Sequence, residues 1–133
     1  MVFDGADVKR LMPELLAMLL AAAPMLASGH PDHGKPQFGG HVAEAGLFQA
    51  ELVDGAGMLT IHITQHGAPM ATQNGKAVIT AQGTAKTISL QLRPSGKNLL
   101  VGQGTLANTG AKTATAVISL PGLPDRMLTF TLE

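Results

Sequence analysis

The chain has 133 residues, with nine Lys and Arg against nine Asp and Glu, so its formal net charge is zero. This balance lacks the basic excess of a nucleic-acid-binding protein and gives no polybasic segment for an anionic membrane. The absence of cysteine excludes disulfide bonds, thiolate metal ligands and cysteine nucleophiles. A hydrophobic content of 45% is too high for a disordered chain, so one folded domain is expected.

Residues 15–27 form an apolar run without charge. The run is shorter than the roughly 20 residues of a membrane-spanning helix, and Lys9 and Arg10 precede it. Because small residues follow at Ala27 and Gly29, the pattern predicts a cleaved signal peptide over residues 1–29, with cleavage after Ala27 as a nearby alternative. The protein is then secreted, with no stable membrane insertion after leader removal. The other interpretation is a short amphipathic helix docked on the domain.

Residues 30–40 contain two prolines and three glycines and show no apolar periodicity, which predicts a flexible tail. From residue 41 the pattern changes to short runs of alternating apolar and polar residues, separated by turn residues. The alternation predicts seven strands, over residues 47–53, 58–64, 76–82, 87–92, 99–106, 113–120 and 126–133.

Short strands at this spacing favour an all-β fold with a single antiparallel β-sandwich over residues 41–133. The arrangement is expected to be immunoglobulin-like or cupredoxin-like. Leu, Ile, Val and Ala would fill the core, with Phe48 and Phe130 as its large members. Such a core should fold without a metal ion.

The five histidines all lie in the first half of the chain, at His30, His33, His41, His62 and His66. Imidazole suits copper, zinc and nickel, and the thioether of methionine suits copper(I) and silver. His66 and Met70 share one predicted turn at an end of the sandwich, and His41 is expected at the same end. These three side chains are the predicted metal ligands of the folded domain. The alternative is a polar turn with Met70 filling a gap beneath it.

His30 and His33 offer a second place for a metal ion, in the tail. If cleavage follows Ala27, the new N-terminus is Ser28-Gly29-His30, whose amine, two amide nitrogens and imidazole suit square-planar Cu(II) or Ni(II). If cleavage follows Gly29, His30 offers an amine–imidazole chelate. The alternative is a solvated tail that binds nothing.

His62 lies on the outward side of its predicted strand, where Glu51 or Gln49 on the preceding strand would be its neighbours. The preferred interpretation is an exposed histidine without a partner, and a contact with one of these two neighbours is the alternative. Catalytic patterns are missing, because the chain has neither H-E-x-x-H nor Gly-x-Ser-x-Gly and its acidic residues are scattered. We therefore expect a protein that is not an enzyme.

Four stretches of the sequence together resemble a known family. They are residues 39–46, residues 48–53 with their Glu-Leu-Val, residues 58–69 ending in Gln-His-Gly-Ala-Pro, and the Leu-Arg-Pro-Ser-Gly-Lys-Asn-Leu of residues 92–99. They resemble the small periplasmic β domain at the N-terminal side of adaptor subunits in heavy-metal efflux systems, and its stand-alone secreted relatives. The resemblance implies a periplasmic location, a metal-associated role and an efflux-system or envelope protein as partner.

The chain departs from the family pattern at three positions. Phe38 stands where the family has a histidine before Gly-Gly, His62 replaces an aromatic residue, and Gln65 replaces an aspartate. A role of the family's first histidine therefore cannot be transferred to Phe38, whereas His66 matches the family's other histidine.

From the sequence we expect a secreted, periplasmic binding module that binds or buffers copper, or otherwise zinc or silver, in connection with heavy-metal efflux. Its metal ligands would be His41 and His66 first, with Met70, His30 and His33 second. The alternative is a non-enzymatic interaction module of an envelope or efflux assembly with no metal site.

Overall fold

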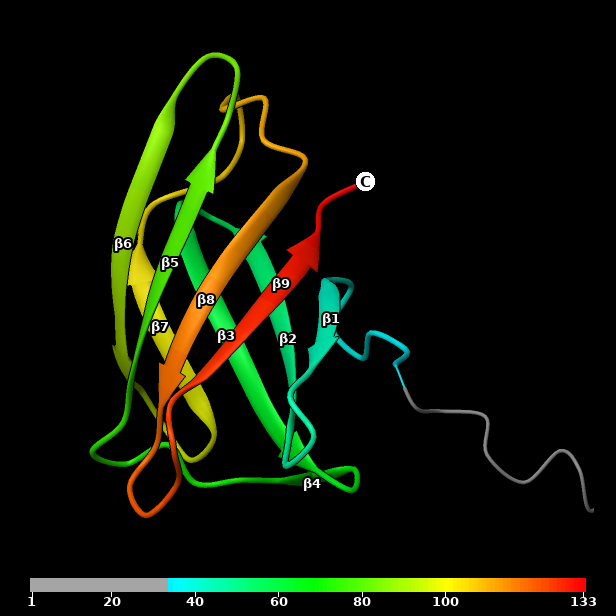
Figure 1. Cartoon of the computed structure of the whole chain (residues 1–133), viewed down its shortest axis with the longest axis vertical. Coiled ribbons are helices and arrows are strands. Elements are labelled where there is room, and N and C mark those ends of the chain that lie inside the picture. Colours follow the sequence, from blue (N-terminus) through cyan, green and yellow to red (C-terminus); the bar gives the residue numbers. More distant parts are fainter. Residues whose placement is uncertain (1–33) are drawn as a thin grey trace, which may run out of the picture. The chain divides into compact units, whose positions relative to one another are not determined.

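A computed structural model describes residues 34–133 (Figure 1). The expected signal peptide and the tail histidines His30 and His33 lie outside these residues. Gly34–Glu133 forms one compact unit by itself. No helix in the described part of the chain has the length and apolar character to cross a membrane.

The described residues form nine strands, and every pairing between them is antiparallel. The strands are β1 (His41–Glu44), β2 (Gln49–Gly55), β3 (Met58–Gln65), β4 (Ala68–Pro69), β5 (Lys76–Gln82), β6 (Thr87–Pro94), β7 (Leu99–Gln103), β8 (Thr113–Ser119) and β9 (Arg126–Thr131). All seven predicted strands are present. The short strands β1 and β4 are additional, and β7 ends at Gln103, three residues before the predicted end.

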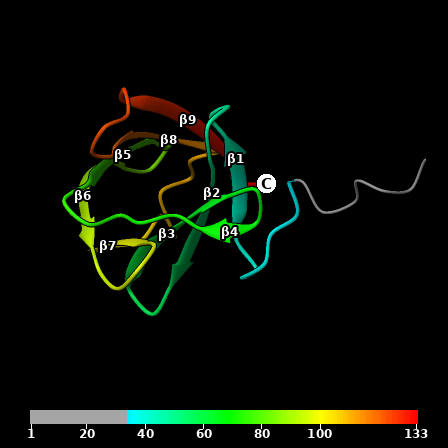
Figure 2. The ribbon, with the colours of Figure 1, turned by 90° about the horizontal axis from the view of Figure 1, so that it is seen from below.

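One continuous sheet runs in the order β1-β2-β3-β7-β6-β5-β8-β9, with β4 paired to β3. The sheet curls into a nearly closed barrel in which β1 and β9 lie side by side, as the end view shows (Figure 2). No backbone ladder joins β1 to β9 within residues 34–133.

The all-β antiparallel class is confirmed, but the expected β-sandwich is not what forms. A sandwich needs two separate sheets, whereas β7 here pairs with β3 on one side and with β6 on the other. Period-two alternation places one face of each strand inward in a sandwich and in a barrel alike, so the sequence pattern does not distinguish the two.

The inward residues of the strands fill the barrel, as the alternation predicted. Phe130 is fully buried and Phe48 is 5% exposed, so both predicted large core members are in place. The aliphatic core is Leu, Ile and Ala, because the valines at positions 53, 78, 101 and 117 lie on outward positions. Fully burying one Leu or Ile side chain stabilises the fold by about 1.5–3 kcal/mol.

Candidate functional site

His41, one of the two first-choice metal ligands, lies on β1 opposite Leu52 of β2. Directly opposed residues share a face of the sheet, and Leu52 is fully buried, so His41 is on the inward face. It lines a cavity of about 200 Å³ with Asp54 and with residues that follow β7 and β9, among them Leu106 and Leu132. Asp54 is already engaged, because it accepts hydrogen bonds from the Thr105 hydroxyl and the Leu106 amide.

His66 is at the other end of the strands. Leu52 pairs with Ile61, and His66 follows Ile61 by five residues, which puts it about 16 Å further along the strand direction than His41. His66 and Gly67 form the turn between β3 and β4, and His66 is exposed with a φ of 52°. The structure therefore does not bring His41 and His66 together at one end of the fold.

Met70 occupies a third place. Its amide donates to the carbonyl of Ile63 at 3.0 Å, so it sits three residues back from His66 along β3, or about 10 Å. The side chain packs partly against the core. Among residues 34–133 no group of three or more His, Asp or Glu side chains gathers closely enough to hold a metal ion. By the registers above, His41, His66 and Met70 lie at three different places of the fold.

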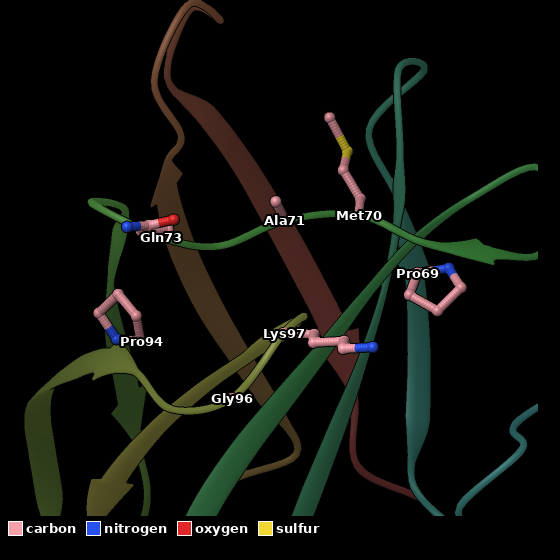
Figure 3. Close-up of a pocket in the computed structure, with 7 residues that line it drawn as sticks. All are labelled: Pro69, Met70, Ala71, Gln73, Pro94, Gly96 and Lys97. Carbon is pink, nitrogen blue, oxygen red and sulfur yellow. The ribbon is translucent and has the colours of Figure 1, made fainter.

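Met70 lines a groove of about 490 Å³. Figure 3 shows residues 69–73 along one side and the turn of residues 94–97 along the other. The fully buried Thr72 ties the two sides together, since its amide donates to the Lys97 carbonyl and its hydroxyl to the Leu99 carbonyl. The groove therefore has a fixed floor, walls of proline and methionine, and Lys97 as its charged group.

The most tightly organised polar group of the described chain is Glu51, which is only 5% exposed on the outward face of β2. Its carboxylate accepts hydrogen bonds from the backbone amides of Gln37, Phe38 and Gly40 at 2.7, 2.8 and 2.9 Å. Residues 37–40, the last part of the expected tail, are thereby attached to the barrel. We call residues 37–40 together with Glu51 and His62 the Glu51 clasp.

His62 is the second anchor of the Glu51 clasp. It lies directly opposite Glu51 in the β2–β3 ladder, which confirms Glu51 as the neighbour of the two suggested by the sequence. The ring of Phe38 stacks on its imidazole with centroids 3.9 Å apart and planes 9° apart. His62 is therefore partly covered rather than exposed and without a partner.

Two glycines allow residues 37–40 to reach β2. Gly39 has a φ of 75°, in the left-handed region that favours glycine. A Cβ on Gly40 would lie 2.2 Å from the carbonyl oxygen of Leu52 and 2.9 Å from a methyl of Val53. Only glycine fits at position 40 without moving β2.

Burial beneath Phe38 lowers the pKa of His62 from its ordinary value of 6.5, and the nearby Glu51 carboxylate opposes this with a smaller raising effect. The folded state therefore binds a proton on His62 less readily than the unfolded state does. The contribution of His62 to the free energy of unfolding is fully present above its pKa in the unfolded state, and it is lost as the pH falls from about 6.5 through the lower folded pKa.

We expect the urea concentration at the unfolding midpoint to decrease when the pH is lowered from about 7.5 to about 5.5, and to decrease less in His62→Gln. The exposed His66 provides the control, because His66→Gln should keep the pH dependence of the original protein. Equal pH dependence in all three proteins would contradict the assignment to His62.

Sequence reasoning missed the Glu51 clasp because the residues that make it look unremarkable. Glu51 alternates as an outward strand residue, and residues 34–40 have the composition of a linker. The available signal was the pair Gly39-Gly40 beside an aromatic residue and close to a predicted strand edge. Such glycines mark close backbone approach as readily as flexibility.

Comparison of the chain with protein-family models, with curated proteins and with solved structures gave no match. The family resemblance therefore rests on the four sequence stretches described above.

Proposed function

We propose that the protein is a secreted, periplasmic module without catalytic activity that carries a borderline or soft metal ion, copper first, on the histidines of its N-terminal tail. The observation that carries the proposal is the separation of His41, His66 and Met70 into three places of the barrel. His30 and His33 are three residues apart and need no fold to meet around one ion. The barrel then acts as the carrier of the tail.

The second candidate is an interaction module that contacts an envelope or efflux protein and binds no metal. The groove beside Met70 favours it, because a hollow with apolar walls and a few polar groups is the usual form of a binding site. Lys97 gives this groove a preference for an anionic group on the partner.

Calorimetric titration of Cu(II) into residues 30–133 and 34–133 tests the first candidate. The shorter chain keeps the Glu51 clasp and lacks only His30, His33 and the residues between them. We expect the longer chain to bind and the shorter one to bind at least about tenfold more weakly, with the difference lost as the pH falls through about 6.5. Equal binding by both would place the ion in the barrel, and binding by neither would leave the interaction module.

The methionine methyl groups report independently on the barrel. Met58, Met70 and Met127 lie at separate positions, so NMR of isotope-labelled methyl groups during a silver(I) titration locates any ion near the fold. We expect no specific shift at Met70. A shift at Met70 that disappears in His66→Gln would contradict the tail as the only site.

A further inference from the structure

The outer face of β6, β5, β8 and β9 differs from the rest of the barrel surface. Because successive residues alternate between faces, the ladder registers fix which side chains share it. One cross-strand row is Gln91, Val78, Val117 and Met127, and the next is Ser89, Thr80, Thr115 and Thr129. A third row consists of the pairs Thr87–Gln82 and Thr113–Thr131. We call these twelve residues the threonine face; Figure 1 shows its four strands side by side.

The threonine face carries no charge at any of its positions. Threonine is common on outward strand positions because of its β propensity, so the hydroxyls alone indicate little. The apolar row adds more, since Met127 is 72% exposed and Val78 is 38% exposed. The opposite wall of the barrel instead carries Glu51 and His62, covered by residues 37–40.

Charges appear at the next row, and they are ordered. Lys76 of β5 pairs with Ser119 of β8. Continuing the β5–β6 and β8–β9 ladders by one residue, beyond Leu92 and Arg126, places Arg93 next to Lys76 and Asp125 next to Ser119. Within residues 34–133 neither Arg93 nor Asp125 has an ion-pair partner. At the other end of the strands Lys86 stands before β6, Lys112 before β8 and Glu133 after β9, so the outermost charges are again positive on the β6 side and negative on the β9 side.

This order is self-complementary about a two-fold axis parallel to the strands. Such an axis places β6 of one copy over β9 of the other. Arg93 of each copy then lies opposite Asp125 of the other copy, and each uncharged row lies against the same row of the second copy. We propose that the threonine face is the interface through which two copies of this chain associate face to face.

The dimensions of the face determine how strong this association is. Four strands about 4.8 Å apart and three rows about 6.7 Å apart give, with their side chains, a footprint of roughly 400 Å². Stable interfaces bury about 800 Å² per partner, so the dimer is a transient one with a dissociation constant on the order of 100 µM. The convex curvature of the barrel also limits the contact area.

Sedimentation equilibrium of residues 34–133 over about 10 µM to 1 mM tests the proposal, with circular dichroism to confirm folding of each variant. Met127→Glu places two carboxylates in the interface and should weaken association by about tenfold or more. Met58→Glu is the matched control, because Met58 is an exposed strand methionine outside the face, and it should leave association unchanged.

The charge order is tested separately by a swap. Arg93→Glu opposes two like charges and should weaken the dimer, whereas Arg93→Glu combined with Asp125→Arg should restore it to within a few-fold of the original. A protein that stays monomeric up to about 1 mM would overturn the proposal and leave the face to a different partner. A dimer that persists in Met127→Glu, or that the double swap fails to restore, would also overturn it.

Discussion

Replacement of Glu51 by alanine is expected to lower the free energy of unfolding by about 3 kcal/mol. The carboxylate accepts three backbone amides, and hydrogen bonds to a charged acceptor are stronger than neutral ones. Without it, the amides of residues 37–40 lose their acceptor on β2 and only the Phe38–His62 stack still holds the segment, so we expect it to detach and its amides to be satisfied by water. Urea unfolding followed by circular dichroism gives the loss, and hydrogen exchange of the Gln37, Phe38 and Gly40 amides gives its location.

Two further variants separate the clasp from general charge effects. Glu51→Gln keeps the size and one strong acceptor, so it should lose less stability than Glu51→Ala. Glu133→Ala removes an exposed carboxylate and should change stability by no more than about 0.5 kcal/mol. Amides of residues 37–40 that remain protected in Glu51→Ala would show that the carboxylate is not what holds them.

Replacement of Gly40 by alanine is expected to detach the same segment and to cost about 2 kcal/mol or more. The new Cβ would meet the Leu52 carbonyl at 2.2 Å, and Leu52 is held by ladders to both β1 and β3, so β2 cannot yield. The loss of the Phe38 ring from His62 should appear as a change in the chemical shifts of the imidazole protons.

Gly55 supplies the matched control for this substitution. Nothing lies within 4 Å of a Cβ built there, so Gly55→Ala should change stability by no more than about 0.5 kcal/mol. Gly40→Ala and Glu51→Ala remove one and the same clasp. The double variant should therefore lose clearly less free energy of unfolding than the sum of the two single losses. Full additivity would mean that the two residues act on separate parts of the structure.

Local patterns in the sequence were sufficient for seven of the nine strands within residues 34–133 and insufficient for the closure of the sheet. The alternation of Ala77, Ile79 and Ala81 with Val78 and Thr80 predicts the two faces of β5, because that division depends only on neighbours along the chain. Whether β7 pairs with both β3 and β6 depends on contacts between distant segments, which alternation does not encode.

The placement of the candidate metal ligands also depends on contacts between distant segments. His41 and His66 were placed together because both flank predicted strands, but the register between β1, β2 and β3 separates them along the strand direction. His62 shows the reverse case. Hairpin geometry narrowed its cross-strand neighbour to Glu51 or Gln49, whereas the cover provided by Phe38 depends on a segment with no strand pattern at all.

The missing ladder between β1 and β9 of the described chain has a consequence for local unfolding. β1 is four residues long and shares a ladder with β2 alone in the described chain, so opening the barrel there breaks the fewest backbone hydrogen bonds. Regions with few such bonds unfold locally at a lower free energy than the whole domain. The first part of the barrel to open is then also the part next to the tail, so the segment that leads into His30 and His33 can be released and recaptured while the remaining strands stay folded.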